Sequence, residues 1–441
     1  MRAQNLRLAI LAGAAAIGAA VTLTGVSALA SAPPERILWQ VDADRGYSAD
    51  VVQLTFTGEM PGGRSMISSP SSLNVLEGLT AAQLNGDARQ PVSFHVLRDA
   101  GQFDCQGFAQ GRHASGECQF RGSQSFAQLL ASRGAGRADN AELYRMTVHN
   151  VGANYLDELK SLHYPTPTVE ELARAGEHGV SVRYMRDMAL AGFPAVKVDG
   201  LVLARDHGID PHYVSGMVSA GYGSLSADEL VQLHDHGVST EFVAGLRQAG
   251  LGRLPAEQIT RLHDHGVSTA WLAGVRRAGY AGLPIDTMIG LADRGVSAEY
   301  MANLQKAGYQ QLPAEQIVKL RDHGVAPEWL DHLQKAGYGG LTIDQLVSLR
   351  DRGVSADYLA ELKHAGYRRL SVDEILQFHD HGVSADYVQD VVALGYGDLP
   401  AQDIVKMRDH GVSAGALRRA GSLRRRLSVD ELIRLRDSGT I

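Results

Sequence analysis

Apolar residues recur with the period of an α-helix from residue 121 to the C-terminus. In one stretch they occupy Phe242, Leu246 and Ala249, the i, i+4 and i+7 spacing of a single helical face. After a glycine and a short turn, a second apolar stretch carries Ile259 and Leu262 and ends at the next glycine. The pattern predicts two short helices in succession, each with one face to bury.

The helix-ending glycines show that this pair belongs to a repeat of 29 residues, the distance from Gly237 to Gly266. The same spacing connects Gly179, Gly208, Gly237, Gly266, Gly295, Gly324, Gly353, Gly382 and Gly411. One step upstream lies Asn150, and Asn shares with Gly the tolerance for the left-handed conformation that a helix end needs. A further step reaches Arg121, so eleven units fit between residue 121 and the C-terminus.

The second helices begin with recognisable caps. Three Ser–Glu pairs have capping-box spacing: Ser226–Glu229, Ser371–Glu374 and Ser428–Glu431. Three prolines are expected at the first helical position: Pro255, Pro313 and Pro400. Because two short helices cannot bury their faces alone, neighbouring units must stack into one continuous core. The sequence therefore predicts a mainly α fold, an αα-hairpin repeat solenoid over residues 121–441.

Two aromatic positions recur in the units. The first lies on the apolar face of the first helix, at Phe126, Tyr155, Tyr184, Tyr213, Phe242, Trp271, Tyr300, Trp329, Tyr358 and Tyr387. The second follows that helix, at Tyr222, Tyr280, Tyr309, Tyr338, Tyr367 and Tyr396. We expect the second set to fill the seam between neighbouring units.

Residues 33–120 have a different period. Val52, Leu54 and Phe56 alternate with polar residues, as apolar positions do again around Phe94, and this period of two predicts a small, mostly β module before the solenoid. Between these strands the Gly/Ser/Pro-rich stretch 58–72 is interpreted as a polar loop, followed by a short helix around residues 80–84. Its near-match to a phosphate-binding loop has Arg64 in place of the required Lys.

The only two cysteines are Cys105 and Cys118. If a two-residue turn falls at Gly111-Arg112, they face each other across a hairpin, which makes a cross-strand disulfide the expected pairing. Two isolated cysteines lack the other ligands of a zinc site, so a bridge is favoured over a metal site or a catalytic thiol.

The N-terminus has the pattern of an export signal. Arg2 and Arg7 precede an apolar run, and Ala28-Leu29-Ala30 supplies the small residues that signal peptidase requires. Residues 1–32 are thus predicted to be a signal peptide, and an uncleaved membrane anchor is the alternative, because the run approaches membrane-spanning length. The location that follows is periplasmic or secreted; in the anchored alternative, the chain is held at the inner membrane and faces the periplasm.

Charge and motifs narrow the function. A net charge of −7 argues against a nucleic-acid partner. His-Asp-His triplets such as His234-Asp235-His236 invite a metal interpretation, but the equivalent positions hold Arg in other units, and Arg does not ligate zinc. We interpret these cations as partners of the helix C-terminus, and the intervening Asp as an acceptor from amides of the following turn. The chain has no H-E-x-x-H motif, and we expect a protein without enzymatic activity, metal or cofactor.

Basic residues near the ends of the first helices form the candidate partner-binding stripe. They are Arg247, Arg276, Arg277, Lys306, Lys335 and Lys363. Such residues also complement the helix dipole and solvate the helix ends, which is the alternative explanation. As a partner-binding stripe, they would attract an acidic protein surface.

Units such as residues 353–381 resemble repeats attached to some bacterial membrane metallopeptidases of the beta-lactam-sensor type. The likeness extends to the preceding segment, residues 94–120, but the zinc peptidase domain is absent from this sequence. The resemblance implies an extracytoplasmic accessory or sensing module. We therefore expect an exported scaffold that binds another protein through its solenoid. The alternative is a ligand-sensing module in envelope or antibiotic-response signalling.

Overall fold

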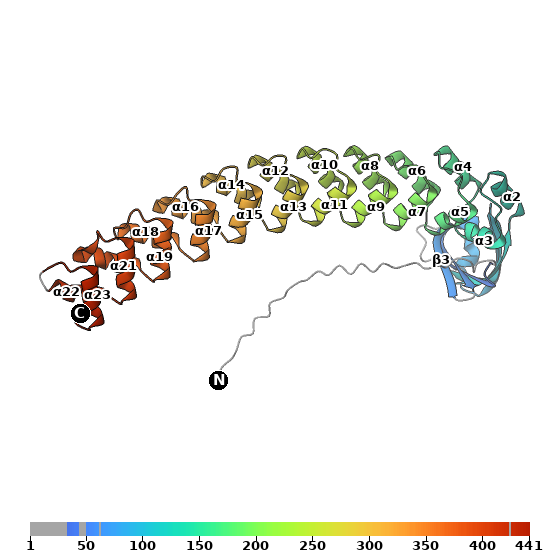
Figure 1. Ribbon diagram of the computed structural model, residues 1–441. Helices are drawn as coiled ribbons and strands as arrows, with labels where there is room; N and C mark the ends of the chain where they lie inside the picture. The colour runs from blue at the N-terminus through green and yellow to red at the C-terminus, as the bar shows by residue number, and fades with distance from the viewer. Residues whose placement is uncertain (1–32, 44–49, 61–62, 423–424) are drawn as a thin grey trace, which may run out of the picture. The chain divides into compact units, whose positions relative to one another are not determined.

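The computed structural model describes residues 33–43, 50–60, 63–422 and 425–441 of the 441-residue chain. A six-stranded sheet is followed by a long series of helices (Figure 1). The predicted signal segment, residues 1–32, lies outside the described residues. In the described part of the chain, no helix combines the length and apolar character that crossing a membrane requires. The described residues divide into two compact units: those up to Arg186 with Ala195–Arg205, and Asp187–Pro194 with those from Asp206 to Ile441.

The sheet confirms the predicted β module. Its strands are β1 (Arg36–Asp42), β2 (Val51–Met60), β3 (Gly63–Ser72), β4 (Gln90–Arg98), β5 (Gly101–Gln110) and β6 (His113–Gly122). All neighbours are antiparallel, in the order β3-β2-β1-β6-β5-β4. Strand β6 therefore lies in the centre of the sheet, and the first helix of the array follows it directly in the sequence.

The interpretation of residues 58–72 as a polar loop is wrong. This stretch completes β2 and forms the edge strand β3, so that Gln53 pairs with Pro70 and Thr55 with Ser68. The side chain of Ser68 also exchanges a 2.7 Å hydrogen bond with that of Thr55. Proline is tolerated on an edge strand, where its missing amide costs no ladder hydrogen bond. Pairing with a well-formed neighbour thus outweighs the low strand propensity of this Gly/Ser-rich sequence.

One face of the sheet forms the core of the β module. Trp39 packs edge-to-face against Phe94, with 4.7 Å between ring centroids, and Phe103 is fully buried. The short helix α1 (Ala81–Leu84), predicted around residues 80–84, covers part of this face with its buried Leu84. Tyr144, from the helix α3 (Asn140–Val148), packs edge-to-face on Phe103. Helix α3 therefore shares a core with the sheet.

The expected disulfide joins Cys105 and Cys118, which are paired residues of β5 and β6 and are both buried. The turn between these strands falls at the predicted Gly111-Arg112, and both residues have positive φ, 56° and 68°. This is the backbone of a tight hairpin turn whose twist matches the strands. The turn sets the register, and the register brings the two sulfurs together.

Eleven helix pairs follow in the described part of the chain, as the repeat predicts. Their helices are α2 (Gln124–Ser132), α3 (Asn140–Val148), α4 (Ala153–Ser161), α5 (Val169–Glu177), α6 (Val182–Ala191), α7 (Val198–Asp206), α8 (Pro211–Ser219), α9 (Ala227–Asp235), α10 (Thr240–Gln248), α11 (Ala256–Asp264), α12 (Thr269–Arg277), α13 (Ile285–Asp293), α14 (Ala298–Lys306), α15 (Ala314–Asp322), α16 (Pro327–Ala336), α17 (Ile343–Asp351), α18 (Ala356–His364), α19 (Val372–Asp380), α20 (Ala385–Val391), α21 (Ala401–Asp409), α22 (Ala414–Gly421) and α23 (Val429–Asp437).

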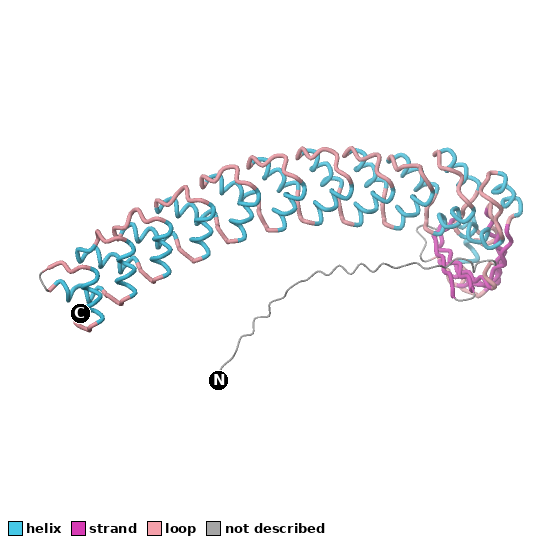
Figure 2. The backbone as a smooth tube through the Cα atoms, in the orientation of Figure 1, coloured by secondary structure: helices cyan, strands magenta, loops and turns pink. Residues whose placement is uncertain are grey.

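Within the second compact unit these helices form two rows (Figures 1 and 2). The first helices, α8 to α22, contact each other in sequence, and so do the second helices, α9 to α23. Leu304, from the first row, and Leu320, from the second, are almost completely buried in the core between the rows. The predicted αα-hairpin solenoid is therefore the fold of this region.

The helix ends lie where the sequence predicts them, except that the prolines at the starts of second helices lie one position earlier. Ser226 caps α9 as part of a capping box, and Gly237 and Asn150 adopt positive φ, 71° and 56°, at helix ends. Pro255 was expected at the first helical position, but it is the N-cap of α11. Its carbonyl accepts the amide of Ile259 at 3.1 Å. Pro313 precedes α15 in the same way, so these prolines stand one residue earlier than predicted.

Candidate interaction surfaces

Neighbouring units are tied by a ladder of ion pairs at the ends of the second helices. His236 Nδ1 lies 2.9 Å from the carboxylate of Asp264, which belongs to the next unit. Equivalent pairs span 2.7 to 3.4 Å: His207–Asp235, His236–Asp264, His265–Asp293, Arg294–Asp322, His323–Asp351, Arg352–Asp380, His381–Asp409 and His410–Asp437. The second cation of each triplet thus contacts a different unit from its own.

The first cation of each triplet lies against the aromatic residue of its own unit. His234 meets Tyr213 edge-to-face, with ring centroids 5.1 Å apart, and the Arg408 guanidinium lies 5.4 Å from the centre of the Tyr387 ring. Arg408 Nε also donates to the carbonyl of Gly382 at 3.0 Å. An imidazole and a guanidinium can both make this contact, because each is a flat cation or partial cation facing a π-system.

These contacts correct the explanation drawn from sequence. Asp264 was expected to accept from amides of the following turn, and His236 to cap its own helix, but the two side chains pair with each other across units. Where the structure describes the chain, no three His, Cys, Asp or Glu side chains converge in a way that could hold a metal ion. A 28-residue offset between His and Asp was visible in the sequence and could have suggested the pairing.

The recurrent aromatics connect units through hydrogen bonds. Tyr300 Oη donates to the carbonyl of Val325 at 2.9 Å, and burial raises the pKa of this phenol to about 12. The second set contacts the next unit, as predicted, since Tyr309 Oη donates to the carbonyl of Leu341 at 3.0 Å. Each unit thus supplies polar contacts to the following one in addition to its apolar face.

The basic stripe divides into two rows with different roles. In the first row, Arg247 donates to the carbonyl of Ala220 at 2.7 Å, and Lys363 donates to that of Ala336 at 3.1 Å. Arg276 makes a longer contact of the same kind, 3.4 Å to Gln248. These three residues satisfy carbonyls at the end of the preceding first helix, which is the structural role weighed as the alternative.

The outer basic row, defined as Arg277, Lys306, Lys335 and His364, is exposed one residue further along each helix. The polar contacts of the row lie within single helices: Arg277 donates to the Ala273 carbonyl at 3.3 Å, Lys306 donates to the Asn303 side chain at 3.1 Å, and Lys335 pairs with the Asp331 carboxylate at 2.5 Å. The equivalent positions in the neighbouring units are neutral: Ser219, Gln248, Ala393 and Ser422. The row is therefore a local feature of four successive units, whereas a helix-capping requirement would apply to every unit.

A shallow groove of about 640 Å³ lies beside this row, between α12 and α14. Arg277, Glu299, Gln305 and Lys306 supply its polar lining, and small side chains supply the rest: Ala270, Gly274, Ala278, Ala298 and Ala302. A Cβ at Gly274 would overlap the Cβ of Ala298, so glycine here permits the close approach of the two helices. A chain in this groove would lie beside two cations and the Glu299 carboxylate.

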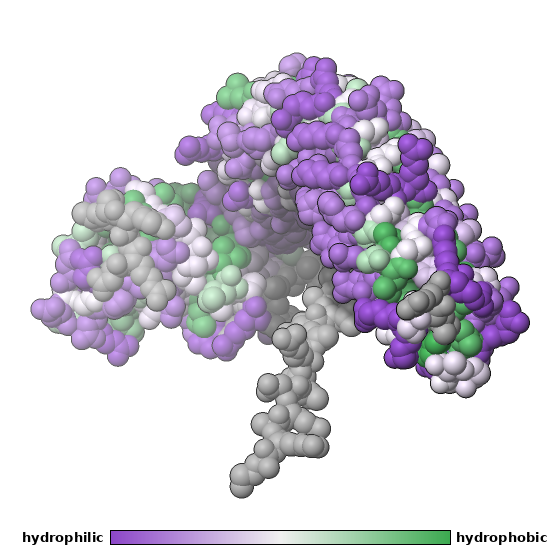
Figure 3. All heavy atoms as spheres, turned by 90° about the vertical axis from the view of Figure 1, so that its left-hand side faces the viewer, coloured by the Kyte–Doolittle hydropathy of each residue, from purple (hydrophilic) through white to green (hydrophobic). Residues whose placement is uncertain are grey.

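Most of the surface seen in Figure 3 is hydrophilic, and its hydrophobic side chains form small, separate patches. Large apolar side chains that are exposed among the described residues include Met66, Val75, Leu97, Phe108, Leu190, Val196 and Val218. None of these lies on α12 to α18, where the outer basic row is located. Recognition at that row would therefore depend on charge and hydrogen bonds.

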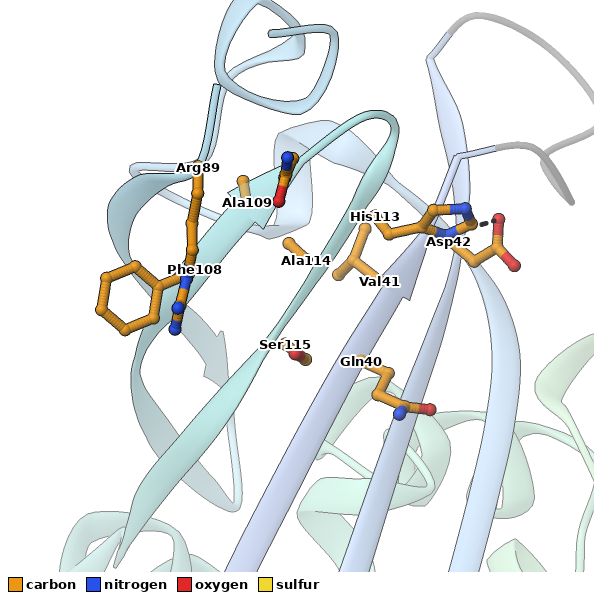
Figure 4. Close-up of a pocket in the computed structure, with 10 residues that line it drawn as sticks. Gln40, Val41, Asp42, Arg89, Phe108, Ala109, His113, Ala114 and Ser115 are labelled. Atoms are coloured by element: carbon orange, nitrogen blue, oxygen red, sulfur yellow. Dashed lines mark ion pairs between the residues drawn. The ribbon is translucent and has the colours of Figure 1, made fainter. Parts of the chain in front are cut away.

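A second candidate surface lies on the outer face of the sheet. A polar cavity of about 590 Å³ is lined by side chains of β1, β5 and β6 and by Arg89 (Figure 4). The Arg89 guanidinium lies 4.0 Å from the centre of the Phe108 ring, and His113 Nδ1 lies 3.6 Å from the Asp42 carboxylate. The sequence analysis did not single out these residues. The one signal it could have used is Phe108, a large apolar residue at an outward-facing position of its strand.

The pentapeptide of residues 411–415 matches the nucleophile-elbow pattern G-x-S-x-G, a match that the sequence interpretation passed over. Its Ser413 is the N-cap of α22, and its Oγ accepts the amide of Ala416 at 3.2 Å. Ser384 caps α20 in the same way one unit earlier. The serine therefore belongs to the capping pattern of the repeat, and it follows a helix turn where an elbow would follow a strand.

The fold and these surfaces define an α-solenoid repeat protein with an N-terminal antiparallel sheet. No family model matches the chain, and a search among curated proteins finds no match.

Proposed function

We propose that the protein is an exported, non-enzymatic scaffold that binds another protein along α12 to α18. The observation that carries this proposal is the outer basic row, which places an exposed basic residue at the same helix position in four successive units, whereas the units on either side have neutral residues at that position. Structural capping does not require them, because Arg276 and Lys363 of the neighbouring row already reach the free carbonyls. A local charge pattern on a regular array is typical of a binding surface.

The spacing of the row favours an acidic segment that lies along the stack. Packed helices are about 8–10 Å apart, so successive cations of the row recur at about that distance. A partner helix advances about 10 Å in seven residues, and an extended chain advances the same distance in three. Acidic side chains at either spacing would meet Arg277, Lys306 and Lys335 in turn. The small residues of the groove between α12 and α14 leave room for the backbone of such a segment.

Cross-linked pull-down from an envelope fraction tests the proposal with the full chain as bait. The variant Arg277→Glu/Lys306→Glu reverses two cations of the row, and we expect it to lose the partner, since each reversed charge repels an acidic segment. The matched control is Arg368→Glu/Arg369→Glu, which changes the net charge equally at two exposed loop residues. A partner recovered equally with both variants would contradict binding at the outer basic row.

Export requires its own measurement. Mass spectrometry of the mature N-terminus, together with cell fractionation, is expected to find cleavage after Ala30 or Ala32 in a protein outside the cytoplasm. An intact N-terminus in the membrane fraction would support the anchored alternative, and a cytoplasmic protein would contradict export. A buried disulfide is consistent with an oxidising compartment.

The second candidate function, a ligand-sensing module, is favoured by the polar cavity on the sheet. It agrees with the resemblance to repeats of sensor-type metallopeptidases, which also implies a sensing role.

A further inference from the structure

We propose that the cavity on the outer face of the sheet binds an acidic saccharide, a short sugar chain that carries a carboxylate. The inference deepens the sensing role and is independent of the partner of the solenoid. The cavity is distant in sequence from the outer basic row and is built entirely within the β module. Its volume, about 590 Å³, is in the range of small-ligand sites.

The cationic side of the cavity is held in place before any ligand arrives. Arg89 has its guanidinium 4.0 Å from the centre of the Phe108 ring, and Figure 4 shows the two side chains stacked at one side of the cavity. Stacking on an aromatic ring leaves the N–H groups at the edge of a guanidinium available for a carboxylate. Arg89 is therefore the residue that would bind the carboxylate of the ligand.

The rest of the lining is suited to hydroxyl groups. Strand pairing places Gln40 opposite Ser115, and Asp42 opposite His113, while Gln110 faces His113 from the other side. Neighbouring strands are about 4.8 Å apart, so these amide, hydroxyl and carboxylate groups form a close array of donors and acceptors. All of them lie on the exposed face of the sheet. Each can exchange hydrogen bonds with a polyhydroxylated ligand.

The geometry excludes two common modes of peptide binding, strand addition and an apolar anchor. The cavity lies over β1, β6 and β5, which are interior strands whose backbone groups are already paired, so no edge is open for an added strand. Its described lining offers no apolar pocket for an anchoring side chain, since the Arg89 guanidinium lies over the Phe108 ring. A ligand here must be recognised through side-chain hydrogen bonds and one cation.

The hairpin at the rim of the cavity is fixed. The amide of Gly111 donates to the carbonyl of Gly86 at 2.8 Å, and that of Arg112 donates to Leu84 at 2.7 Å. The Arg112 side chain donates to the carbonyl of Ala43 at 2.8 Å, which ties the hairpin to the end of β1. The backbone that carries Gln110 and His113, which flank this turn, is therefore held in place before a ligand binds. Preorganisation of this kind favours binding.

Calorimetric titration of the full chain with trigalacturonate, a linear acidic trisaccharide, tests the proposal. We expect saturable binding that weakens at least tenfold in Arg89→Gln, and at least tenfold weaker binding of maltotriose, a neutral sugar of similar size. Loss of a charge-assisted hydrogen bond accounts for both effects. Arg89 is exposed, so the variant is expected to fold normally.

Two controls make the outcome decisive. Arg121→Gln removes an exposed arginine from the same face of β6 outside the cavity and should leave the affinity unchanged. Triglutamate carries carboxylates without sugar hydroxyls and should bind at least tenfold more weakly than trigalacturonate. The proposal is overturned by any of three results: no saturable binding of trigalacturonate, equal losses in Arg89→Gln and Arg121→Gln, or equal affinity for triglutamate. Loss of the protein partner in the pull-down would leave this binding unaffected.

Discussion

Tyr300 donates a hydrogen bond from its phenol to the carbonyl of Val325, 25 residues further along the chain and in the next unit. Tyr213, Tyr358 and Tyr387 repeat the contact with the equivalent valines, and Trp271 makes it through its indole nitrogen. One aromatic residue therefore supplies both apolar burial within its unit and a polar link to the next unit. This relationship explains why the position is aromatic in so many units.

Phe242 occupies the same position but has no hydroxyl group. Adding one by substitution with tyrosine is therefore expected to stabilise the protein. We expect Phe242→Tyr to donate to the carbonyl of Val267 and to raise the free energy of unfolding by about 0.5–1.5 kcal/mol. The reciprocal change, Tyr300→Phe, should lower it by a similar amount. Urea denaturation of both variants measures the effect. A destabilised Phe242→Tyr would show that this unit cannot accommodate the contact.

Alkaline pH should destabilise the array. Burial raises the pKa of Tyr300 and Tyr387 to about 12, whereas the unfolded chain titrates near the ordinary value of about 10. Between these values the unfolded state loses phenolic protons that the folded state keeps, so the free energy of unfolding falls as the pH rises. Each tyrosine accounts for at most about 1.4 kcal/mol per pH unit.

The matched variant is Tyr300→Phe/Tyr387→Phe. It should be less stable at neutral pH, because two hydrogen bonds are lost, yet its stability should decline less steeply above about pH 10. Denaturation at neutral pH and at about pH 11 separates the two effects. Identical slopes in the variant and the wild type would assign the alkaline loss to other groups.

Glycines inside the helices are predicted to differ in their tolerance of alanine. At Gly274 in α12 a methyl group would overlap Ala298 of α14, and we expect Gly274→Ala to cost about 1–3 kcal/mol. Gly290 in α13 has no neighbouring atom within 4 Å of its added Cβ. Gly290→Ala should therefore stabilise the protein by about 0.5–1 kcal/mol through helix propensity. Thermal denaturation of the two variants should show shifts of opposite sign.

The His–Asp ladder should contribute little per pair. Both side chains of the His236–Asp264 pair are more than 40% exposed, and exposed ion pairs are worth about 0.2–1 kcal/mol. A double-mutant cycle with His236→Gln and Asp264→Asn at about pH 6 should give a coupling energy in that range, which falls as salt is added. A coupling of several kcal/mol, insensitive to salt, would show that the pair is not screened as its exposure implies.

The repeat made the helical region predictable to within a residue or two. Its glycines, capping boxes and aromatics mark the ends and faces of short helices, and each signal acts within one turn or one unit. The stretch 58–72 was misread because its strand is formed by pairing with β2, a long-range interaction that a Gly/Ser-rich sequence does not signal. The helix-end Asp and His were noticed, but their partners were not, because the partners lie in the next unit.

For the candidate surfaces, too, the sequence identified some residues and only the structure showed what they contact. The basic stripe was found as a set of six residues, but the structure separates Arg247, Arg276 and Lys363, which reach backbone carbonyls, from the outward-facing residues. The cavity beside Arg89 gave no sequence signal, because its lining comes from strands that are distant along the chain.

The sequence by itself determined the period, the helix pairs and their caps, the hairpin register and the cysteine pairing, because these depend on local propensity and on short, regular offsets. Only the tertiary structure decided which cations support the neighbouring unit and which face outward. It also decided where a polar cavity forms on the sheet. Those outcomes depend on how units and strands pack, which brings together residues that no local pattern connects.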